Sequence, residues 1–134
     1  MWDQLSDEER TWKETCRRFA SEVIEPVYRQ CDEENRFPRE VHDAAYAQGL
    51  MNIALPSELG GGGRSYKILA VGGEELAAVC SPTAFGMGFN HGALQPVLHA
   101  GTDAQKQRFV KELLERRGYA ALCLTEPDAS GSDL

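Results

Sequence analysis

One segment of the sequence has the composition of a β-strand, and we find no other segment that can pair with it. The run YAALCLTE, residues 119–126, is compactly apolar and too short for a stable helix, which favours a strand. A lone strand leaves its backbone donors and acceptors without partners. We therefore expect an all-α fold over residues 1–118, and we expect residues 119–134 to begin a second domain whose sheet lies elsewhere.

The first helical segment carries both a start signal and an apolar stripe. Ser6 stands three residues before Glu9, which makes a capping box, and acidic residues fill the first turn. Apolar residues then recur every three or four positions, at Trp12, Cys16, Phe19, Val23 and Val27. Pro26 has to bend or break this helix because proline lacks an amide hydrogen, and a further turn or two should end near Asn35.

Four more helices are expected before residue 118. Their starts carry proline or a capping hydroxyl, and glycine follows two of them, with Gly49 at a position where a left-handed backbone is needed. They run from Pro38 to Gly49, from Ser65 to about Cys80, from Pro82 to about His99, and from Thr102 to Gly118, and Phe109, Val110, Leu113 and Leu114 of the last are expected to face inward. The run LGGGG, residues 59–63, lacks the frame of a phosphate-binding loop and is interpreted as a flexible turn between helices.

The charge and the cysteines exclude several classes of function. The net charge of −7 disfavours nucleic acid as a partner, because a polyanion would be repelled. The four cysteines are far apart and show no metal-ligand spacing, so we expect free thiols and no metal at Cys16, Cys31, Cys80 and Cys123. The longest wholly hydrophobic run, residues 119–124, is too short to span a membrane. A soluble, folded protein is expected.

The segment from Pro82 to His99 contains a candidate apolar pocket. Aromatic and apolar residues alternate there with small ones: Phe85, Met87, Phe89 and Leu94 with glycine at 86, 88 and 92. They either line a ligand pocket or fill a core, and the glycines favour a pocket because they leave space that a core would fill. His91 has no evident acid–base partner in the sequence, so it is interpreted as a structural histidine.

The stretch TEPDASGSD offers a second candidate site. Pro127 stops the expected strand, and the following loop can present backbone amides and hydroxyls to a polar heterocycle or a pyrophosphate. The alternative is a serine-rich surface turn, and the residues alone leave both interpretations open.

This stretch resembles the acyl-CoA dehydrogenase family, in which a strand leads into T-E-P-x-A-G-S-D between a helical and a β domain. The matching residues are Thr125, Glu126, Pro127, Ala129, Gly131, Ser132 and Asp133. Four further segments are similar to family segments in the same order: RRFASEVIEPV, AQGLMNIALPSELGGGG, EELAAVCSP and HAGTDAQKQRFV. The resemblance implies an orthogonal helical bundle over residues 1–118, followed by the first strand of a β domain that is cut short at Leu134. Ser130 lengthens the family's loop by one residue.

The resemblance also implies a chemistry. Family members oxidise an acyl thioester to its α,β-unsaturated form, and FAD accepts the hydride. By resemblance, Leu122, Leu124 and Thr125 approach the flavin, Gly131 and Ser132 approach its phosphates, Ser132 also touches the pantetheine arm, and the acyl tail lies against Phe85, Gly88, Phe89 and Leu94. The catalytic base belongs to a part of the family's chain beyond Leu134, so no residue here is catalytic, Glu126 included.

The partners implied are an acyl thioester of coenzyme A or of a carrier protein, and an electron-transfer flavoprotein or a similar acceptor. The resemblance further implies a homotetramer or dimer in the cytoplasm, or in the mitochondrial matrix of a eukaryote. Two alternatives stay open: another flavoenzyme on the same scaffold, such as a flavin monooxygenase or nitroalkane oxidase, and a non-catalytic helical interaction module.

Overall fold

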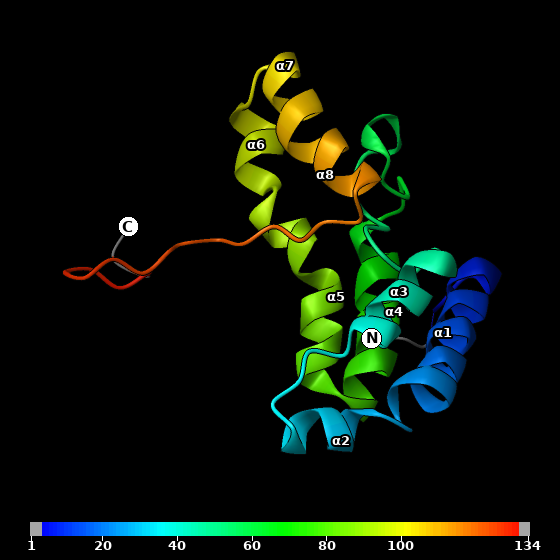
Figure 1. Ribbon diagram of the computed structural model, residues 1–134. Helices are drawn as coiled ribbons and strands as arrows, with labels where there is room; N and C mark the ends of the chain where they lie inside the picture. The colour runs from blue at the N-terminus through cyan, green and yellow to red at the C-terminus, as the bar shows by residue number, and fades with distance from the viewer. Residues whose placement is uncertain (1–3, 132–134) are drawn as a thin grey trace.

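A computed structural model of the protein describes residues 4–131, and this part of the chain is helical with no sheet. The α-helices are α1 (Asp7–Phe19), α2 (Tyr28–Glu33), α3 (Arg39–Ala47), α4 (Tyr66–Val79), α5 (Ser81–Ala93), α6 (Gln95–Ala100), α7 (Asp103–Lys106) and α8 (Glu112–Glu115). Two π-helical turns, Ala20–Ile24 and Gln107–Lys111, and a 3₁₀ turn, Ser57–Leu59, complete the set. Helix α4 packs against both α1 and α5, and α6 packs against α7 (Figure 1). The expected all-α fold is confirmed.

Three of the predicted helix starts, at Ser6, Ser65 and Thr102, are confirmed by capping hydrogen bonds. The Ser6 hydroxyl accepts the Glu9 N–H at 3.2 Å, and the Glu9 carboxylate accepts the Ser6 N–H at 2.8 Å. Ser65 caps α4 by accepting the Ile68 N–H at 3.3 Å. Thr102 forms a second capping box at the start of α7. These caps satisfy amides that have no partner inside the helix, which is why the short sequence pattern locates them.

Two helix ends differ from the predicted ones. The helix expected from Pro82 to His99 is divided, because Pro96 in the first turn of α6 has no N–H for Gly92 and its ring crowds the preceding turn. The last helix ends before the expected Gly118, because α8 stops at Glu115 and Arg117 takes the left-handed conformation, with φ of 53°. Gly49 does carry the predicted left-handed conformation after α3, with φ of 69°.

The glycine run at residues 59–63 is a packed turn, so our prediction of a flexible one is wrong. The amides of residues 61–64 all donate to carbonyls of residues 52–56, at 2.8 to 3.0 Å. A Cβ at Gly62 would lie 2.6 Å from the Ile53 oxygen, and a Cβ at Gly61 would clash with the backbone of Leu55. Since these amides are occupied, the turn has no donors with which to cradle a phosphate.

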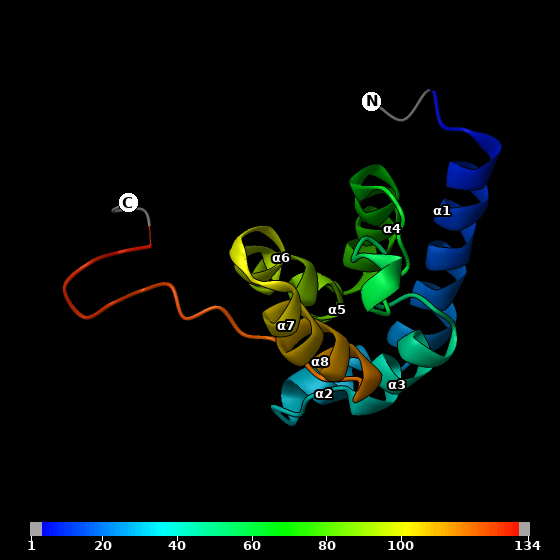
Figure 2. The ribbon, with the colours of Figure 1, turned by 90° about the horizontal axis from the view of Figure 1, so that it is seen from above.

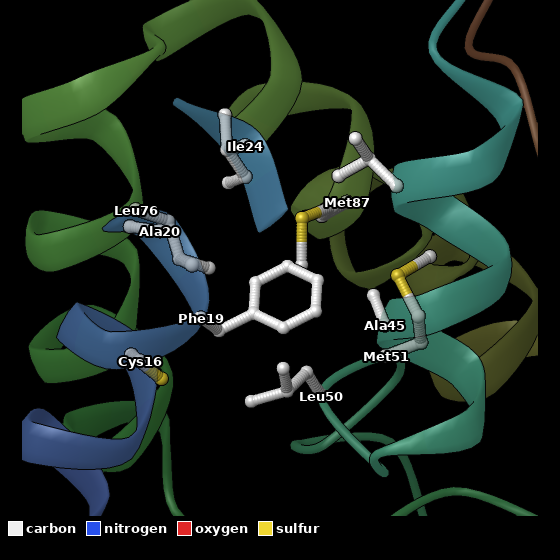
Figure 3. Packing of buried hydrophobic residues seen from close by; sticks show 10 residues of the cluster. Cys16, Phe19, Ala20, Ile24, Ala45, Leu50, Met51, Leu76 and Met87 are labelled. Atoms are coloured by element: carbon white, nitrogen blue, oxygen red, sulfur yellow. The ribbon is translucent and has the colours of Figure 1, made fainter. Parts of the chain in front are cut away.

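The core consists of two apolar clusters. The first lies between α1, α3, α4 and α5, and the Phe19 ring points into its centre (Figure 3). Its buried members are Cys16, Phe19, Ala20, Ile24, Val41, Ala45, Leu50, Met51, Leu76 and Met87, with Trp12, Val23 and Val27 packed against them. The second consists of Leu55, Leu59, Leu94, Val110 and Leu114. Phe109 is 46% exposed, so its predicted inward orientation is wrong, because it lies one position off the stripe of Val110 and Leu114.

Contact between α1 and α4 depends on a glycine. A Cβ at Gly72 would lie 2.5 Å from Trp12 Nε1 and 2.8 Å from Cys16 Sγ, so the two helices approach too closely for a side chain there. Beside this contact, Arg17 of α1 donates to the Glu75 carboxylate of α4 at 2.7 Å. This close packing explains why a helix tolerates Gly72 despite its cost in helix propensity.

Residues 119–131 leave the helices as a tail, which both views show (Figures 1 and 2). The strand expected over residues 119–126 does not form in the described part of the chain, because no second strand lies beside it. A single bridge pairs Glu126 with Ala129 across a turn. Within residues 4–131, no helix combines the length and the apolarity that crossing a membrane requires.

Candidate functional site

An apolar pocket of about 390 Å³ lies between α1, α4 and α5. Three of the residues that we predicted to bind an acyl chain line it together: Phe85, Gly88 and Phe89. The fourth, Leu94, does not line this pocket and is instead buried in the second core cluster. The remaining lining residues are Trp12, Cys16, Leu50, Ile53, Leu69, Gly72, Gly73, Leu76, Ala84, Met87, His91 and Gly92.

Open space at the glycines supports the pocket interpretation over a packed core. A Cβ built at Gly88 or at Gly92 would meet no heavy atom within 4 Å apart from the helix's own backbone. The Phe85 and Phe89 rings stack at a tilt, with centroids 5.0 Å apart, and Phe85 is 68% exposed. The pocket therefore has an aromatic edge, and its wall is recessed at Gly88 and Gly92, where no side chain projects.

No Asp, Glu, Lys or Arg of the described chain lines this pocket. Burial raises the pKa of the Cys16 thiol to about 12, and nearby Glu75 adds to the effect, so Cys16 is a neutral thiol at physiological pH. Trp12 Nε1 is buried against Gly72 and has no hydrogen-bond partner among residues 4–131. Because the described residues of its lining include no charged side chain, the pocket is suited to an uncharged, apolar group.

His91 lines the pocket, but both of its ring nitrogens are occupied. Nε2 accepts the Ala54 N–H at 3.0 Å, which leaves Nδ1–H to donate to the Gly88 carbonyl at 2.9 Å. Burial lowers the pKa of His91, so the ring stays neutral. The interpretation of His91 as a structural residue is confirmed.

The residues predicted to contact a flavin belong to the tail, and Figure 2 shows the tail running away from α1, α4 and α5, the helices that carry most of the pocket lining. Leu122 and Leu124 are half-exposed, and Thr125 is exposed. The tail turns back on itself, since a Cβ at Gly131 would lie 2.7 Å from Leu124 Cδ2. Ser132, predicted to contact both cofactor and substrate, lies outside the described residues.

Sequence reasoning missed a buried histidine, His42. Its side chain is 1% exposed, and neither ring nitrogen has a hydrogen-bond partner within the described range. The ring packs against Phe37 and Tyr119, with centroids 4.6 and 5.4 Å away, and burial lowers its pKa. No local pattern marks this residue, because one of its ring neighbours, Tyr119, is far away in the sequence.

Sequence reasoning also missed a polar network around Asn90. Its partners are Asn52 and the backbone of Gly118 and Ala120, which lie far from Asn90 in the sequence. Among the residues that the structure describes, no three His, Cys, Asp or Glu side chains gather as a metal site.

Comparison with known proteins agrees with this geometry. The family model "Acyl-CoA dehydrogenase, N-terminal domain" matches residues 6–117. The chain belongs to the acyl-CoA dehydrogenase family. It is 35% identical to the 3-sulfinopropanoyl-CoA desulfinase of Paraburkholderia xenovorans over 96% of this chain and 33% of that protein. It is 33% identical to the mitochondrial short-chain specific acyl-CoA dehydrogenase of Bos taurus, and 32% identical to that of Homo sapiens, in each case over 97% of this chain and 32% of the relative.

A solved structure shares the fold. It is described as an electron transferring flavoprotein of Acidaminococcus fermentans, with a TM-score of 0.84 and 27% identity over 96% of this chain and 34% of that one. The chain thus spans about a third of the length of these curated relatives and of this structure. The family is therefore established, whereas the activity of a whole protein containing this chain is a matter for proposal.

Proposed function

We propose that this chain supplies one wall of the acyl pocket, and part of one side of the flavin site, in an FAD-dependent acyl-CoA dehydrogenase. The observation that carries the proposal is the uncharged pocket beside α5, with open space at Gly88, in a chain of this family. The substrate would be an acyl thioester, which the enzyme converts to its α,β-unsaturated form.

The pocket's contribution is to bind hydrocarbon and to exclude water. Each methylene moved from water into such a pocket stabilises the complex by about 0.8 kcal/mol. Because no charged side chain of the described residues reaches the pocket, an acyl tail enters it without displacing an ion pair. Excluding water also strengthens the polar interactions at the thioester end.

The tail has the chemistry of one side of a flavin site. Leu122 and Leu124 offer apolar surface to an aromatic ring system, and Thr125 offers a hydroxyl. Gly131 and Ser132 would contact the phosphates, and Ser132 the pantetheine arm. FAD, when bound, supplies the hydride acceptor. This chain's residues bind and orient, and the proton-abstracting base would come from another part of the protein.

The proposed partners rest on the family to which the chain belongs. The thioester would be carried by coenzyme A or by a carrier protein, and the electrons would pass to an electron-transfer flavoprotein or similar acceptor. We propose a homo-oligomer, a tetramer or dimer, located in the cytoplasm or the mitochondrial matrix.

The test is anaerobic mixing of the flavin-loaded whole protein with butanoyl-CoA and octanoyl-CoA. Flavin absorbance should bleach as the enoyl-CoA product appears by mass spectrometry, in equal amounts. Bleaching by a nitroalkane, with none by either thioester, would identify a different flavoenzyme. A protein that neither holds flavin nor consumes thioester would be a non-catalytic module, and the proposal would be wrong.

A further inference from the structure

The start of the tail is held by the side chain of one buried residue, Asn90 of α5. This side chain is 2% exposed, and its amide group uses both its donor and acceptor atoms. Nδ2 donates to Asn52 Oδ1 at 3.0 Å and to the Gly118 carbonyl at 3.1 Å, while Oδ1 accepts the Ala120 N–H at 2.8 Å. Asn90 therefore holds the backbone on both sides of residue 119.

Two further residues complete this network. Asn52 Nδ2 donates to the Tyr46 hydroxyl at 3.3 Å, and that hydroxyl donates to the Gly118 carbonyl at 3.2 Å. The backbone of Asn52 is left-handed, with φ of 57°. The Gly118 carbonyl thus receives two hydrogen bonds, and the whole network is buried or partly buried, where an unmade hydrogen bond is costly.

The chemistry of the site requires an asparagine. One planar group has to donate twice and accept once within a small space. Aspartate lacks the donors and would bring a charge, alanine lacks both kinds of atom, and glutamine is one methylene longer. Next to this network, the Tyr119 ring packs on His42, but such an apolar contact does not fix the direction of a backbone.

We propose that Asn90 is a positioning residue. By fixing residues 118–120 against α5, it sets the place of the tail relative to the pocket wall on the same helix. The anchoring stands on the hydrogen bonds alone, while its catalytic consequence rests on the proposed function. In a whole enzyme the tail residues Leu122 to Thr125 would then meet the flavin at a fixed distance from Phe85 and Gly88.

Amide hydrogen exchange on this chain tests the anchoring. In the unmodified protein the Ala120 amide should exchange at least about tenfold more slowly than the Ala121 amide. In Asn90→Ala the Ala120 amide should exchange about tenfold faster than before, a change of about 1.4 kcal/mol, relative to amides in the middle of α5. Equal exchange at Ala120 and Ala121 in the unmodified protein overturns the proposal, even if the variant does not fold.

Asn52→Gly is the matched control. It permits the left-handed backbone but removes the side chain that Asn90 donates to, so it lowers stability while leaving Asn90 free to hold Gly118 and Ala120. Ala120 should stay slow in this variant. If Asn52→Gly frees Ala120 as much as Asn90→Ala does, Asn90 contributes only general stability and the proposal is wrong.

Steady-state kinetics of the flavin-loaded whole protein test the consequence. Asn90→Ala should lower kcat about tenfold while the KM for octanoyl-CoA changes less than about twofold, because the pocket wall is untouched. Fast Ala120 exchange with an unchanged kcat would overturn the positioning role. If the unmodified protein consumes no thioester, the proposed function fails, and with it the catalytic consequence, while the exchange data still decide the anchoring.

Discussion

Gly88→Leu is the substitution that probes the pocket most directly. A Cβ at Gly88 meets no heavy atom within 4 Å, so the leucine side chain would extend into the open space of the pocket. In the flavin-loaded whole protein it would occupy the place of the far end of a long acyl tail. Such overpacking costs about 1 to 3 kcal/mol, and 1.36 kcal/mol corresponds to about tenfold in rate. The ratio of kcat/KM for butanoyl-CoA over octanoyl-CoA should therefore rise about tenfold.

The same substitution should not destabilise the helical domain. Leucine favours a helix over glycine by about 0.8 kcal/mol, and its Cβ would meet no neighbouring heavy atom within 4 Å. Urea unfolding of this chain should accordingly give an equal or higher free energy of unfolding. Gly88→Ala is the control, because it gains the helix propensity while adding one methyl group, and it should leave chain-length preference nearly unchanged.

Two results would refute this reasoning. An equal loss of kcat/KM for short and long thioesters would mean that acyl tails do not pass Gly88. A drop in unfolding free energy without any change of preference would mean that Gly88 lets two elements pack closely, contrary to the open space in the structure.

Three further outcomes follow from the contacts. Gly72→Ala should lower the free energy of unfolding by about 1 to 3 kcal/mol, because its methyl would overlap Trp12 and Cys16, and urea unfolding measures this. Burial lowers the pKa of His42 and His91, so these residues take up protons in the unfolded chain before they do so in the folded one as the pH falls through about 6.5. The free energy of unfolding should therefore fall between about pH 7 and about pH 5. His42→Leu should remove part of this pH dependence, which urea unfolding at several pH values measures. This chain alone should bind little FAD, since it holds part of one side of the site, and a stoichiometric complex of about micromolar affinity or tighter in a fluorescence titration would contradict this.

Features set by neighbours in sequence could be predicted, and those set through space could not. The Ser6, Ser65 and Thr102 caps each depend on a partner three residues away, so a short pattern locates them. The stripe headed by Trp12 follows from helical periodicity in the same way. Asn90 instead meets residues that are 28 to 38 positions away, and no periodicity in the sequence marks such a pair.

Glycine was the hardest residue type to interpret from sequence, because one residue type serves several physical purposes here. Gly49 adopts a left-handed backbone after a helix. Gly62 and Gly72 let neighbouring segments pack against their backbones, and Gly88 leaves space open in the pocket. The place of Gly49 after a helix marks the first purpose, and the aromatic residues around Gly88 favour a pocket, but nothing local marks Gly62 or Gly72 as points of close approach. The tail presented the opposite case, since its composition is that of a strand, while strand formation depends on a partner that the described chain does not supply.

The two faces of α5 explain why one helix serves both proposals, and they lead to a last prediction. Thr83, Met87, Asn90 and Leu94 recur at spacings of four, three and four and are all buried. Phe85, Gly88, Phe89 and Gly92 recur on another face and line the pocket. Leu94, at the C-terminal end of the buried face, lies in the second core cluster and does not line the pocket.

Gly88 and Asn90 project about 200° apart around the helix axis, so a side chain added at one does not reach the partners of the other. The losses of transition-state stabilisation in Gly88→Leu and Asn90→Ala should therefore add in the double variant to within about 0.5 kcal/mol. The measurement is kcat/KM for octanoyl-CoA in the unmodified protein, both single variants and the double variant. Gly88→Leu alone should change chain-length preference, and Asn90→Ala alone should free the Ala120 amide. A coupling well above that limit would mean that the pocket wall and the tail junction move together, and that α5 does not separate binding from positioning.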